Sequence, residues 1–297
     1  MTKVGHSPLI AIHAGAGALT VKLTEHEAEI RTVLGEVLGS GRRLLEQGAD
    51  AVDVVKAAVV IMEDYELFNA GRGSALCSDG SAQMSASVMR GSDRAAGGVA
   101  GVMHTKNPVL AAGAVLDSYQ VLMIGEHAEE FARSQGAEQR PNDYFITARQ
   151  QGNLSRHVEQ YPAGTVGTVC VDASGTLAAA TSTGGITGQP PGRVGDSPLI
   201  GAGNWADGRV AVSCTGDGEL FIRAGVARTI AALVEQGSSL RDAADRALAE
   251  VTEFGGTGGL IVCGADGSVA LPFTTEAMPR GVWSAGGEPQ VWVTEAT

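Results

Sequence analysis

Apolar residues along the chain follow two different spacings, which predicts a mixture of helices and strands. Three- and four-residue spacing is typical of helices that bury one face, and it predicts helices at about 27–47, 51–62, 128–134, 219–235 and 239–253, with another beginning at Asn107-Pro108. Short runs of apolar and β-branched residues are typical of strands. They predict strands at about 9–13, 84–89, 98–104, 121–124, 165–171, 176–182, 199–202, 210–214, 259–263, 268–273, 280–284 and 290–294.

The order of these elements indicates the fold class. Strands, paired helices and further strands follow one another in each half of the chain, which suits two sheets packed face to face with helices outside. We therefore predict an α+β fold, a four-layer αββα sandwich, as a single domain over 1–297. The polar segment 151–164 is the best candidate for a flexible linker.

Composition and charge narrow the classes of function. The chain has 297 residues, of which 44% are hydrophobic and 4% aromatic, so aliphatic residues and alanine are expected to fill its core. A net charge of −12 without any run of Lys or Arg argues against nucleic acid and membrane as partners. A small-molecule or peptide substrate is expected instead. No apolar run is long enough for a membrane span or signal core, which indicates a cytoplasmic protein.

Cysteine and histidine spacing gives no sign of a metal or redox site. The four cysteines form no C-x-x-C pair and are expected to be small core residues: Cys77, Cys170, Cys214 and Cys263. The six histidines show no metal-ligand spacing. The turn at 14–17 lacks the third glycine of a dinucleotide-binding loop, because position 20 is threonine. No catalytic cofactor is expected.

The central sequence GTVG at 164–167 opens a run of small and β-branched residues. On its own this run predicts an ordinary buried strand. If the bond between Gly164 and Thr165 were cut, however, Thr165 would carry a hydroxyl nucleophile and a free α-amine, a base with a pKa of roughly 7.7–8.0, on one residue. Gly164 suits such a cut because it has no Cβ to hinder approach to its carbonyl.

Two glycine-rich loops are further candidates for function. The first, 65–73, contains Asn69 and could equally be a plain connection with Asn69 in a left-handed turn. The second, 182–198, is too rich in glycine and proline for regular structure. Its low charge and embedded apolar residues favour an ordered, functional loop over a disordered one.

Six motifs in order closely resemble the plant-type L-asparaginase/isoaspartyl aminopeptidase family, whose members are N-terminal-nucleophile hydrolases. The motifs lie at 11–17, 67–73, 164–167, 182–185, 191–198 and 213–219. The resemblance implies self-cleavage between Gly164 and Thr165 into an α subunit of 1–164 and a β subunit of 165–297. It also implies that Thr165 is the nucleophile, with Thr183 and Thr215 orienting its hydroxyl and amine.

The resemblance further implies a substrate clamp and an oxyanion hole. Arg193 would hold the α-carboxylate of the substrate and Asp196 its α-ammonium, which suits the chemistry of both side chains. The carbonyl of Gly216 would accept from the ammonium. Asn69 and a backbone amide near Gly15 would form the oxyanion hole.

A structural sodium ion and a homodimer of cleaved protomers are also implied by the resemblance. The sodium-binding loop would use backbone carbonyl oxygens of Met62, Glu63, Tyr65, Phe68, Ala70 and Arg72. The chain departs from the family pattern at Ala14, where a glycine is usual, at Ser85 in a strand that is usually acidic, and at Asp217, which adds a carboxylate beside the ammonium pocket.

We therefore expect an enzyme that hydrolyses L-asparagine and β-aspartyl dipeptides. Two alternatives remain. A glycosylasparaginase shares the nucleophile and the clamp, but the chain reads Gly-Thr-Val-Gly and Ser-Thr-Gly-Gly where those enzymes read Asp-Thr-Ile-Gly and Ser-Thr-Asn-Gly. The second alternative is an uncleaved, inactive protein of the same fold that only binds an amino acid. Such binding would require the clamp residues but no free amine on Thr165.

Overall fold

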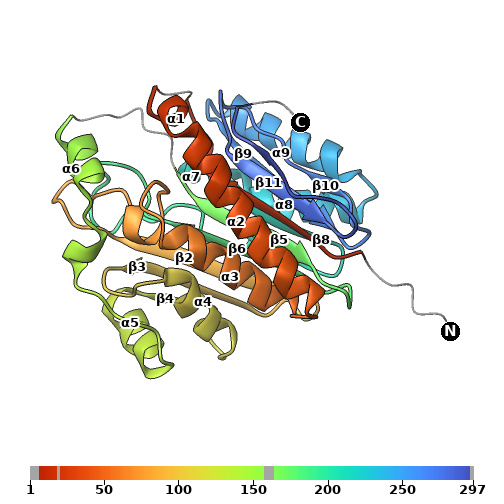
Figure 1. Ribbon diagram of the computed structural model, residues 1–297, viewed down its shortest axis with the longest axis horizontal. Helices are drawn as coiled ribbons and strands as arrows, with labels where there is room; N and C mark the ends of the chain where they lie inside the picture. Colours follow the sequence, from red (N-terminus) through yellow and green to blue (C-terminus); the bar gives the residue numbers. More distant parts are fainter. Residues whose placement is uncertain (1–6, 19–20, 157–163, 295–297) are drawn as a thin grey trace.

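Two β-sheets form the centre of the protein (Figure 1). The computed structural model describes residues 7–18, 21–156 and 164–294. The larger sheet has the order β12 (Gln290–Trp292), β11 (Arg280–Ser284), β1 (Leu9–Ala14), β5 (Val166–Val171), β6 (Leu177–Thr183), β2 (Met84–Arg90), β3 (Ala96–Val102) and β4 (Leu122–Ile124). The smaller sheet has the order β10 (Val269–Ala270), β9 (Gly258–Gly264), β8 (Val210–Gly216) and β7 (Asn204–Ala206). Only the β3–β4 pair of these strands is parallel.

Helices cover the outer faces of both sheets, so the chain has an α+β fold. The larger sheet packs against α2 (Glu27–Glu46), α3 (Ala51–Glu63) and α4 (Pro108–Leu116), which share one apolar core with it. The smaller sheet packs against α8 (Val226–Glu235) and α9 (Leu240–Glu253) around a second core. A third core lies between the two sheets, where β5 and β6 contact β8. The remaining helices are α1 (Val21–Glu25), α5 (Gly125–Ser134), α6 (Ala148–Ser155), α7 (Gly218–Ala224) and the 3-10 turns η1 (Gly71–Gly73) and η2 (Asn142–Phe145).

Strand β5 occupies the middle of the molecule. It pairs with β1 on one side and β6 on the other, with Gly167 opposite both His13 and Thr181. Every residue of β5 is buried, because helices cover one face of its sheet and the smaller sheet covers the other. This explains its unbroken run of apolar and small residues. Thr165, which directly precedes β5, is thereby fixed in a rigid, central position.

Several predicted boundaries are confirmed. The Asp50 side chain accepts a hydrogen bond of 2.9 Å from the backbone N–H of Asp53 and so caps α3. Helix α4 begins at Pro108, directly after Asn107. All four cysteines are free and buried, as expected of small core residues.

Three predicted elements are wrong. The predicted helix 219–235 is divided by Gly225, whose φ of 56° is left-handed and ends α7 before α8 begins. The predicted strand 199–202 is a turn around Gly201, with φ of 93°, and the strand follows it as β7. In the predicted linker 151–164, residues 151–155 belong to α6, capped by Thr147. Residues 157–163 lie outside the described part of the chain.

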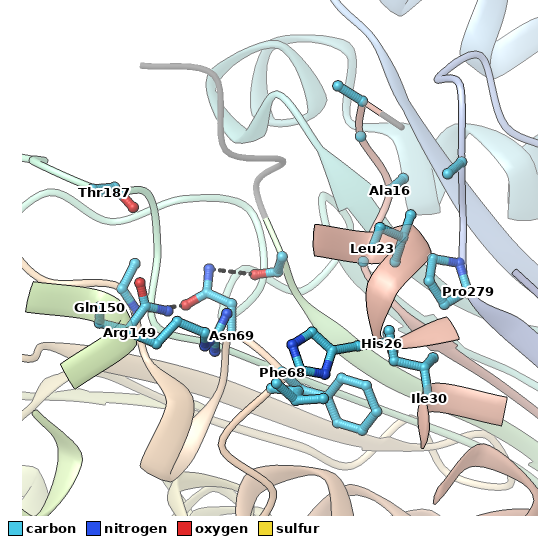
Figure 2. A pocket seen from close by; sticks show the side chains of 18 of the residues that line it. Ala16, Leu23, His26, Ile30, Phe68, Asn69, Arg149, Gln150, Thr187 and Pro279 are labelled. Atoms are coloured by element: carbon cyan, nitrogen blue, oxygen red, sulfur yellow. Dashed lines mark hydrogen bonds between the residues drawn. The ribbon is translucent and has the colours of Figure 1, made fainter. Parts of the chain in front are cut away.

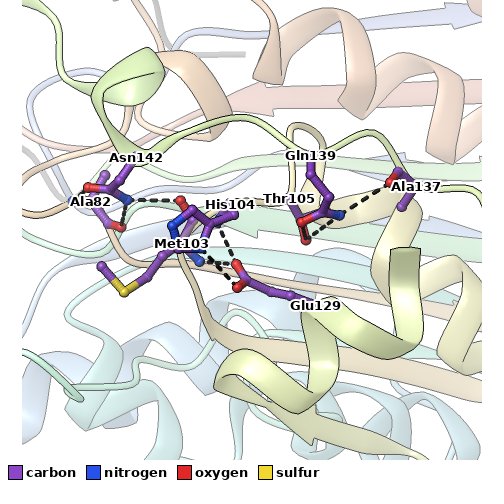
Figure 3. A network of polar contacts seen from close by, with 8 residues as sticks. All are labelled: Ala82, Met103, His104, Thr105, Glu129, Ala137, Gln139 and Asn142. Atoms are coloured by element: carbon purple, nitrogen blue, oxygen red, sulfur yellow. Dashed lines mark hydrogen bonds and ion pairs between the residues drawn. The ribbon is translucent and has the colours of Figure 1, made fainter. Parts of the chain in front are cut away.

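A partly buried polar network fixes α5 to the segment that follows β3 (Figure 3). The Glu129 carboxylate accepts from the backbone N–H groups of Met103 and His104, and it lies 3.1 Å from the Nδ1 atom of His104. The Asn142 amide donates to the carbonyls of Ala82 and Met103 at 2.9 and 2.8 Å. These contacts satisfy backbone groups where the chain leaves the sheet.

The helices in the described part of the chain include none with the length and apolar composition of a membrane span.

Candidate active site

Thr165 and Thr183 meet at the Gly164 carbonyl. Thr165 is buried and donates from Oγ1 to the Oγ1 atom of Thr183 at 3.2 Å. Thr183, at the end of β6, donates in turn to the Gly164 carbonyl oxygen at 3.1 Å and accepts from the Gly185 N–H at 3.0 Å. The hydroxyl of Thr165 therefore connects to the adjacent peptide carbonyl through a single intervening hydroxyl.

Asn69 supplies the second donor to the same carbonyl. Its Nδ2 atom donates to the Gly164 oxygen at 2.7 Å and to the Gly185 oxygen at 2.6 Å, while its Oδ1 atom accepts from Ala75 at 2.6 Å (Figure 2). A Cβ atom at Gly164 would lie 2.6 Å from that of Asn69, so only glycine fits there. Asn69 does not have a left-handed backbone. Two donors on one carbonyl oxygen match the needs of an oxyanion.

Thr215 lies at the end of β8, in the sheet that packs against β5, and is fully buried. Two residues before it, Ser213 forms hydrogen bonds with His13 at 3.0 Å and Thr181 at 2.8 Å. Complete burial lowers the pKa of His13 to about 3, so its ring is neutral at physiological pH. Sequence spacing gave no signal for this network, because its members come from three separate strands.

Arg193 and Asp196 lie close together, with both side chains beside Gly218. A Cβ atom at Gly218 would lie 3.1 Å from the Arg193 Nη2 atom and 3.0 Å from the Asp196 Oδ1 atom. The Asp196 side chain is buried, and its Oδ2 atom has no hydrogen-bond partner within the described residues. Burial raises the pKa of Asp196 to about 7. A cationic group beside Asp196 would stabilise its ionised form.

Glu219 accepts two hydrogen bonds from one edge of the Arg193 guanidinium. The sequence did not predict this contact. The Nε and Nη2 atoms of Arg193 donate to the two carboxylate oxygens of Glu219 at 2.8 Å each. The Nη1 atom lies 3.4 Å from the Oε1 atom of Gln189. Because a guanidinium carries five N–H groups, its Nη1–Nη2 end retains one N–H on each nitrogen for a carboxylate.

The Asp217 side chain contacts the residue that precedes β9. This exposed side chain accepts a 2.6 Å hydrogen bond from the Thr257 N–H, which connects the start of α7 to the start of β9.

The neighbouring Gly216 has a φ of 153°, in the range that favours glycine. Gly15, with φ of 102°, donates weakly to the His13 Nδ1 atom at 3.5 Å.

The other two departures from the family pattern lie within strands. Ala14 ends β1, and its N–H donates to the Pro279 carbonyl at 2.8 Å. Ser85 in β2 accepts from the Gly101 N–H at 3.4 Å. Within the described part of the chain, neither Ala14 nor Ser85 forms a hydrogen bond with Thr165.

The predicted sodium loop is tightly wound between α3 and η1. Backbone N–H groups within the loop donate to the carbonyls of Met62 (3.3 Å), Tyr65 (3.1 Å) and Ala70 (3.2 Å). Cβ atoms at Gly71 and Gly73 would overlap carbonyl oxygens of Glu63, Glu66 and Phe68. Arg72 lies in η1 and donates from Nη1 to the Tyr144 carbonyl at 3.1 Å. Backbone carbonyl oxygens, such as those of this loop, are ligands that hard cations prefer. Within the described residues no cluster of three or more His, Cys, Asp or Glu side chains could hold a metal.

The Glu63 carboxyl connects this loop to the site through Ser182. It is fully buried, and its Oε1 atom accepts from the Ser182 hydroxyl at 2.6 Å and from the Val109 N–H at 3.0 Å. Ser182 directly precedes Thr183, so this contact fixes the end of β6. Burial raises the pKa of Glu63 to about 8 from an ordinary value of 4.5.

The raised pKa of Glu63 predicts that stability falls as pH rises. The unfolded chain releases this proton above pH 4.5, whereas the folded protein keeps it until about pH 8. The stabilisation is therefore complete below pH 4.5 and is lost as pH rises toward 8, by up to about 1.4 kcal/mol per pH unit. Thermal unfolding of Glu63→Gln should have a shallower dependence over this range than wild type. The exposed Glu253→Gln is the control, and an unchanged slope in Glu63→Gln would contradict the assignment.

A pocket of about 120 Å³ adjoins this site (Figure 2). Asn69, Gly164 and Gly185 line one part of it, and the turn that follows β1 lines another. The clamp residues Arg193 and Asp196 do not line it. The pocket and the pair Arg193 and Asp196 are therefore separate features of the structure.

Comparison with known proteins identifies the family. The chain matches the family model described as Asparaginase over residues 6–293. It is 48% identical to an isoaspartyl peptidase of Salmonella typhimurium, over 95% of this chain and 96% of that protein. It is 36% identical both to the human isoaspartyl peptidase/L-asparaginase (94% and 93% covered) and to a probable isoaspartyl peptidase/L-asparaginase 2 of Arabidopsis thaliana (96% and 98%). With nearly its whole length matched, this chain belongs to the asparaginase family.

Proposed function

We propose that the protein hydrolyses L-asparagine and β-aspartyl dipeptides after cutting itself between Gly164 and Thr165. The observation that carries the proposal is the contact of Thr183 and Asn69 with the Gly164 carbonyl, directly beside the Thr165 hydroxyl. The names of the relatives support the substrate class.

In the self-cleavage step, the Thr165 oxygen attacks the carbonyl carbon of Gly164. Thr183 orients the Thr165 hydroxyl by accepting its hydrogen bond, and the developing negative charge falls on the oxygen that Asn69 contacts at 2.7 Å. The C–N bond then breaks, and the nitrogen takes the proton that the Thr165 hydroxyl has given up, which makes it the free amine of Thr165. The resulting ester is hydrolysed by water, which leaves a carboxylate on Gly164 and restores the hydroxyl of Thr165.

In the cut enzyme, the same oxygen attacks the side-chain carbonyl of the substrate. The α-amine of Thr165 acts as the base, because its ordinary pKa of roughly 7.7–8.0 leaves a usable neutral fraction at physiological pH. Ammonia or an amino acid leaves with a proton, and water hydrolyses the aspartyl ester. Thr183 and Thr215 keep the nucleophile oriented, with Asn69 and a backbone amide near Gly15 as donors to the oxyanion.

The clamp selects the aspartyl head group. We assign the Nη1–Nη2 end of Arg193 to the α-carboxylate, since this edge can be used without breaking the ion pair with Glu219. The unpartnered, buried Asp196 Oδ2 atom suits the α-ammonium, with the Gly216 carbonyl as a second acceptor. A bound ammonium would also lower the raised pKa of Asp196.

We further assign the chain to the four-layer αββα sandwich of N-terminal-nucleophile hydrolases, as one domain. The subunits 1–164 and 165–297 should stay together after cleavage, because β1 and β5, from different subunits, pair along their whole length. We also propose a homodimer of cleaved protomers. The carbonyl oxygens of the loop containing Met62, Glu63 and Phe68 are the proposed donors to a structural sodium ion, which would take no part in the chemistry.

The substrate class is tested with purified protein. L-asparagine and β-aspartyl dipeptides should be hydrolysed, whereas α-aspartyl dipeptides should not, because their scissile carbonyl would miss Thr165 once the head group is clamped. Product aspartate is measured by chromatography. Preference for glycosylated asparagine over both expected substrates would overturn the assignment in favour of a glycosylasparaginase.

A further inference from the structure

Gln189 is a buried residue of the loop 182–198, which also carries Arg193, and it is 3% exposed. Its Oε1 atom accepts from the backbone N–H of Ile186 at 3.1 Å and from the Nη1 atom of Arg193 at 3.4 Å. Its Nε2 atom donates to the Sγ atom of Cys77 at 3.7 Å. Because Ile186 and Arg193 both present N–H groups, only the oxygen of the amide can face them. The orientation of this buried side chain is therefore defined.

The turn against which Gln189 packs is held by other residues of the site. A Cβ atom at Gly185 would lie 2.1 Å from the Gln189 Oε1 atom, so the amide lies directly against the Gly185 backbone. Gly185 donates to the Thr183 Oγ1 atom at 3.0 Å and accepts from the Asn69 Nδ2 atom at 2.6 Å. These two contacts do not involve Gln189. The turn therefore provides a fixed support for the amide.

The amide oxygen of Gln189 limits which N–H groups of Arg193 remain for a substrate. The Arg193 side chain is 12% exposed, and its guanidinium has five N–H groups. Two of them donate to Glu219 at 2.8 Å each, and one on Nη1 donates to Gln189. The two that remain, one on each Nη atom, form the pair that a carboxylate accepts side by side. Without the Gln189 oxygen, hydrogen bonds to Glu219 would hold only one edge of the guanidinium.

The uncharged nature of this acceptor suits a site that binds a carboxylate. Glu219 already places a negative charge on the Arg193 guanidinium, and Asp196 lies nearby. A further carboxylate at position 189 would offset the positive charge and repel the α-carboxylate of the substrate. An amide oxygen orients the guanidinium through a hydrogen bond and leaves its charge available to the substrate.

We propose that Gln189 is a positioning residue for substrate binding, which orients Arg193 toward the α-carboxylate of the substrate without touching the substrate itself. The inference rests on the proposed function, because it requires the head group to bind at Arg193. Since Thr183 and Asn69 hold the Gly185 turn through their own contacts, loss of the Gln189 amide should alter KM and leave kcat and self-cleavage nearly unchanged.

The test measures KM and kcat for L-asparagine in two variants of Gln189. Gln189→Leu has a similar size but no acceptor, and it should raise KM by about three- to tenfold with kcat within about twofold of wild type. Gln189→Glu keeps an acceptor oxygen and the side-chain length but adds a negative charge, so it should raise KM by at least about tenfold. Gln139→Leu is the matched control, at a partly buried glutamine whose amide contacts Thr105 and Ala137 instead, and it should keep the wild-type KM.

A double variant shows whether Gln189 acts through Arg193. The comparison uses kcat/KM, which can be measured far below saturation. In an Arg193→Ala background, Gln189→Leu should change kcat/KM by less than about twofold, because the guanidinium that Gln189 orients is absent. A purely structural role would lower kcat or the cleaved fraction, and its effect would persist without Arg193.

The inference is overturned if KM is unchanged in both Gln189 variants, if kcat falls instead of KM rising, or if Gln189→Leu costs as much without Arg193 as with it. Should Gln189→Leu prove insoluble, Gln189→Glu decides alone, and an unchanged KM in that variant overturns the inference. All of these results leave the proposed function intact as long as wild type hydrolyses L-asparagine. Absence of hydrolysis by wild type would instead refute the proposed function.

Discussion

Thr165→Ala is expected to yield a single uncut chain of 297 residues with no hydrolase activity. The variant retains Gly164, Asn69 and Thr183 but lacks the oxygen that attacks the Gly164 carbonyl, so neither the cut nor the later reaction can begin. The cost to activity should be at least about 10⁴-fold, because a covalent nucleophile is lost. Denaturing electrophoresis and an aspartate-release assay measure both effects.

Thr165→Ser is the matched control. It keeps the hydroxyl and loses only a methyl group, so it should cut itself at least in part and regain activity in proportion to the cut fraction. Hydrolase activity in Thr165→Ala would assign the nucleophile to another residue.

Arg193→Ala is expected to raise KM by about 100-fold or more while self-cleavage remains complete. The loss of two charged hydrogen bonds to the substrate carboxylate accounts for this magnitude, and the contacts around the Gly164 carbonyl do not include Arg193. Steady-state kinetics on L-asparagine gives KM, and electrophoresis gives the extent of cleavage.

Arg209→Ala is a suitable control for Arg193→Ala. Arg209 is an exposed arginine that also forms an ion pair, with Glu235, and it lies at the opposite end of β8 from Gly216. Its removal should change neither KM nor cleavage. If Arg193→Ala failed to cut itself, the loop around Arg193 would have a structural role in maturation, which contradicts its assignment to the substrate alone.

Local signals explain which parts of the fold could be predicted from the sequence. Asp50 and Pro108 mark helix starts through contacts within a few residues, and the predicted positions are correct. The division at Gly225 and the turn at Gly201 depend on left-handed backbone angles that tertiary packing selects. Isolated glycines elsewhere in the chain have the same appearance in sequence, so these two could not be distinguished.

The residues of the site also divide into those that local sequence motifs indicate and those that only tertiary packing brings together. Linear motifs pointed to Thr165, Thr183 and Asn69, and the structure places them within hydrogen-bond contact of one another or of the Gly164 carbonyl. The contacts of Glu219 with Arg193 and of Glu63 with Ser182 join residues 26 and 119 positions apart. No spacing rule links such pairs, because packing between layers of the fold brings them together.

The most direct test of the account is the intact mass of the wild-type protein together with its activity. Two polypeptides are expected, 1–164 and 165–297, with N-terminal sequencing of the second reading Thr165-Val166-Gly167. Activity should appear in step with the cut chain, because only the cut frees the amine that serves as base. A fully active protein that remains one uncut polypeptide would contradict the central claim, however well the other residues match.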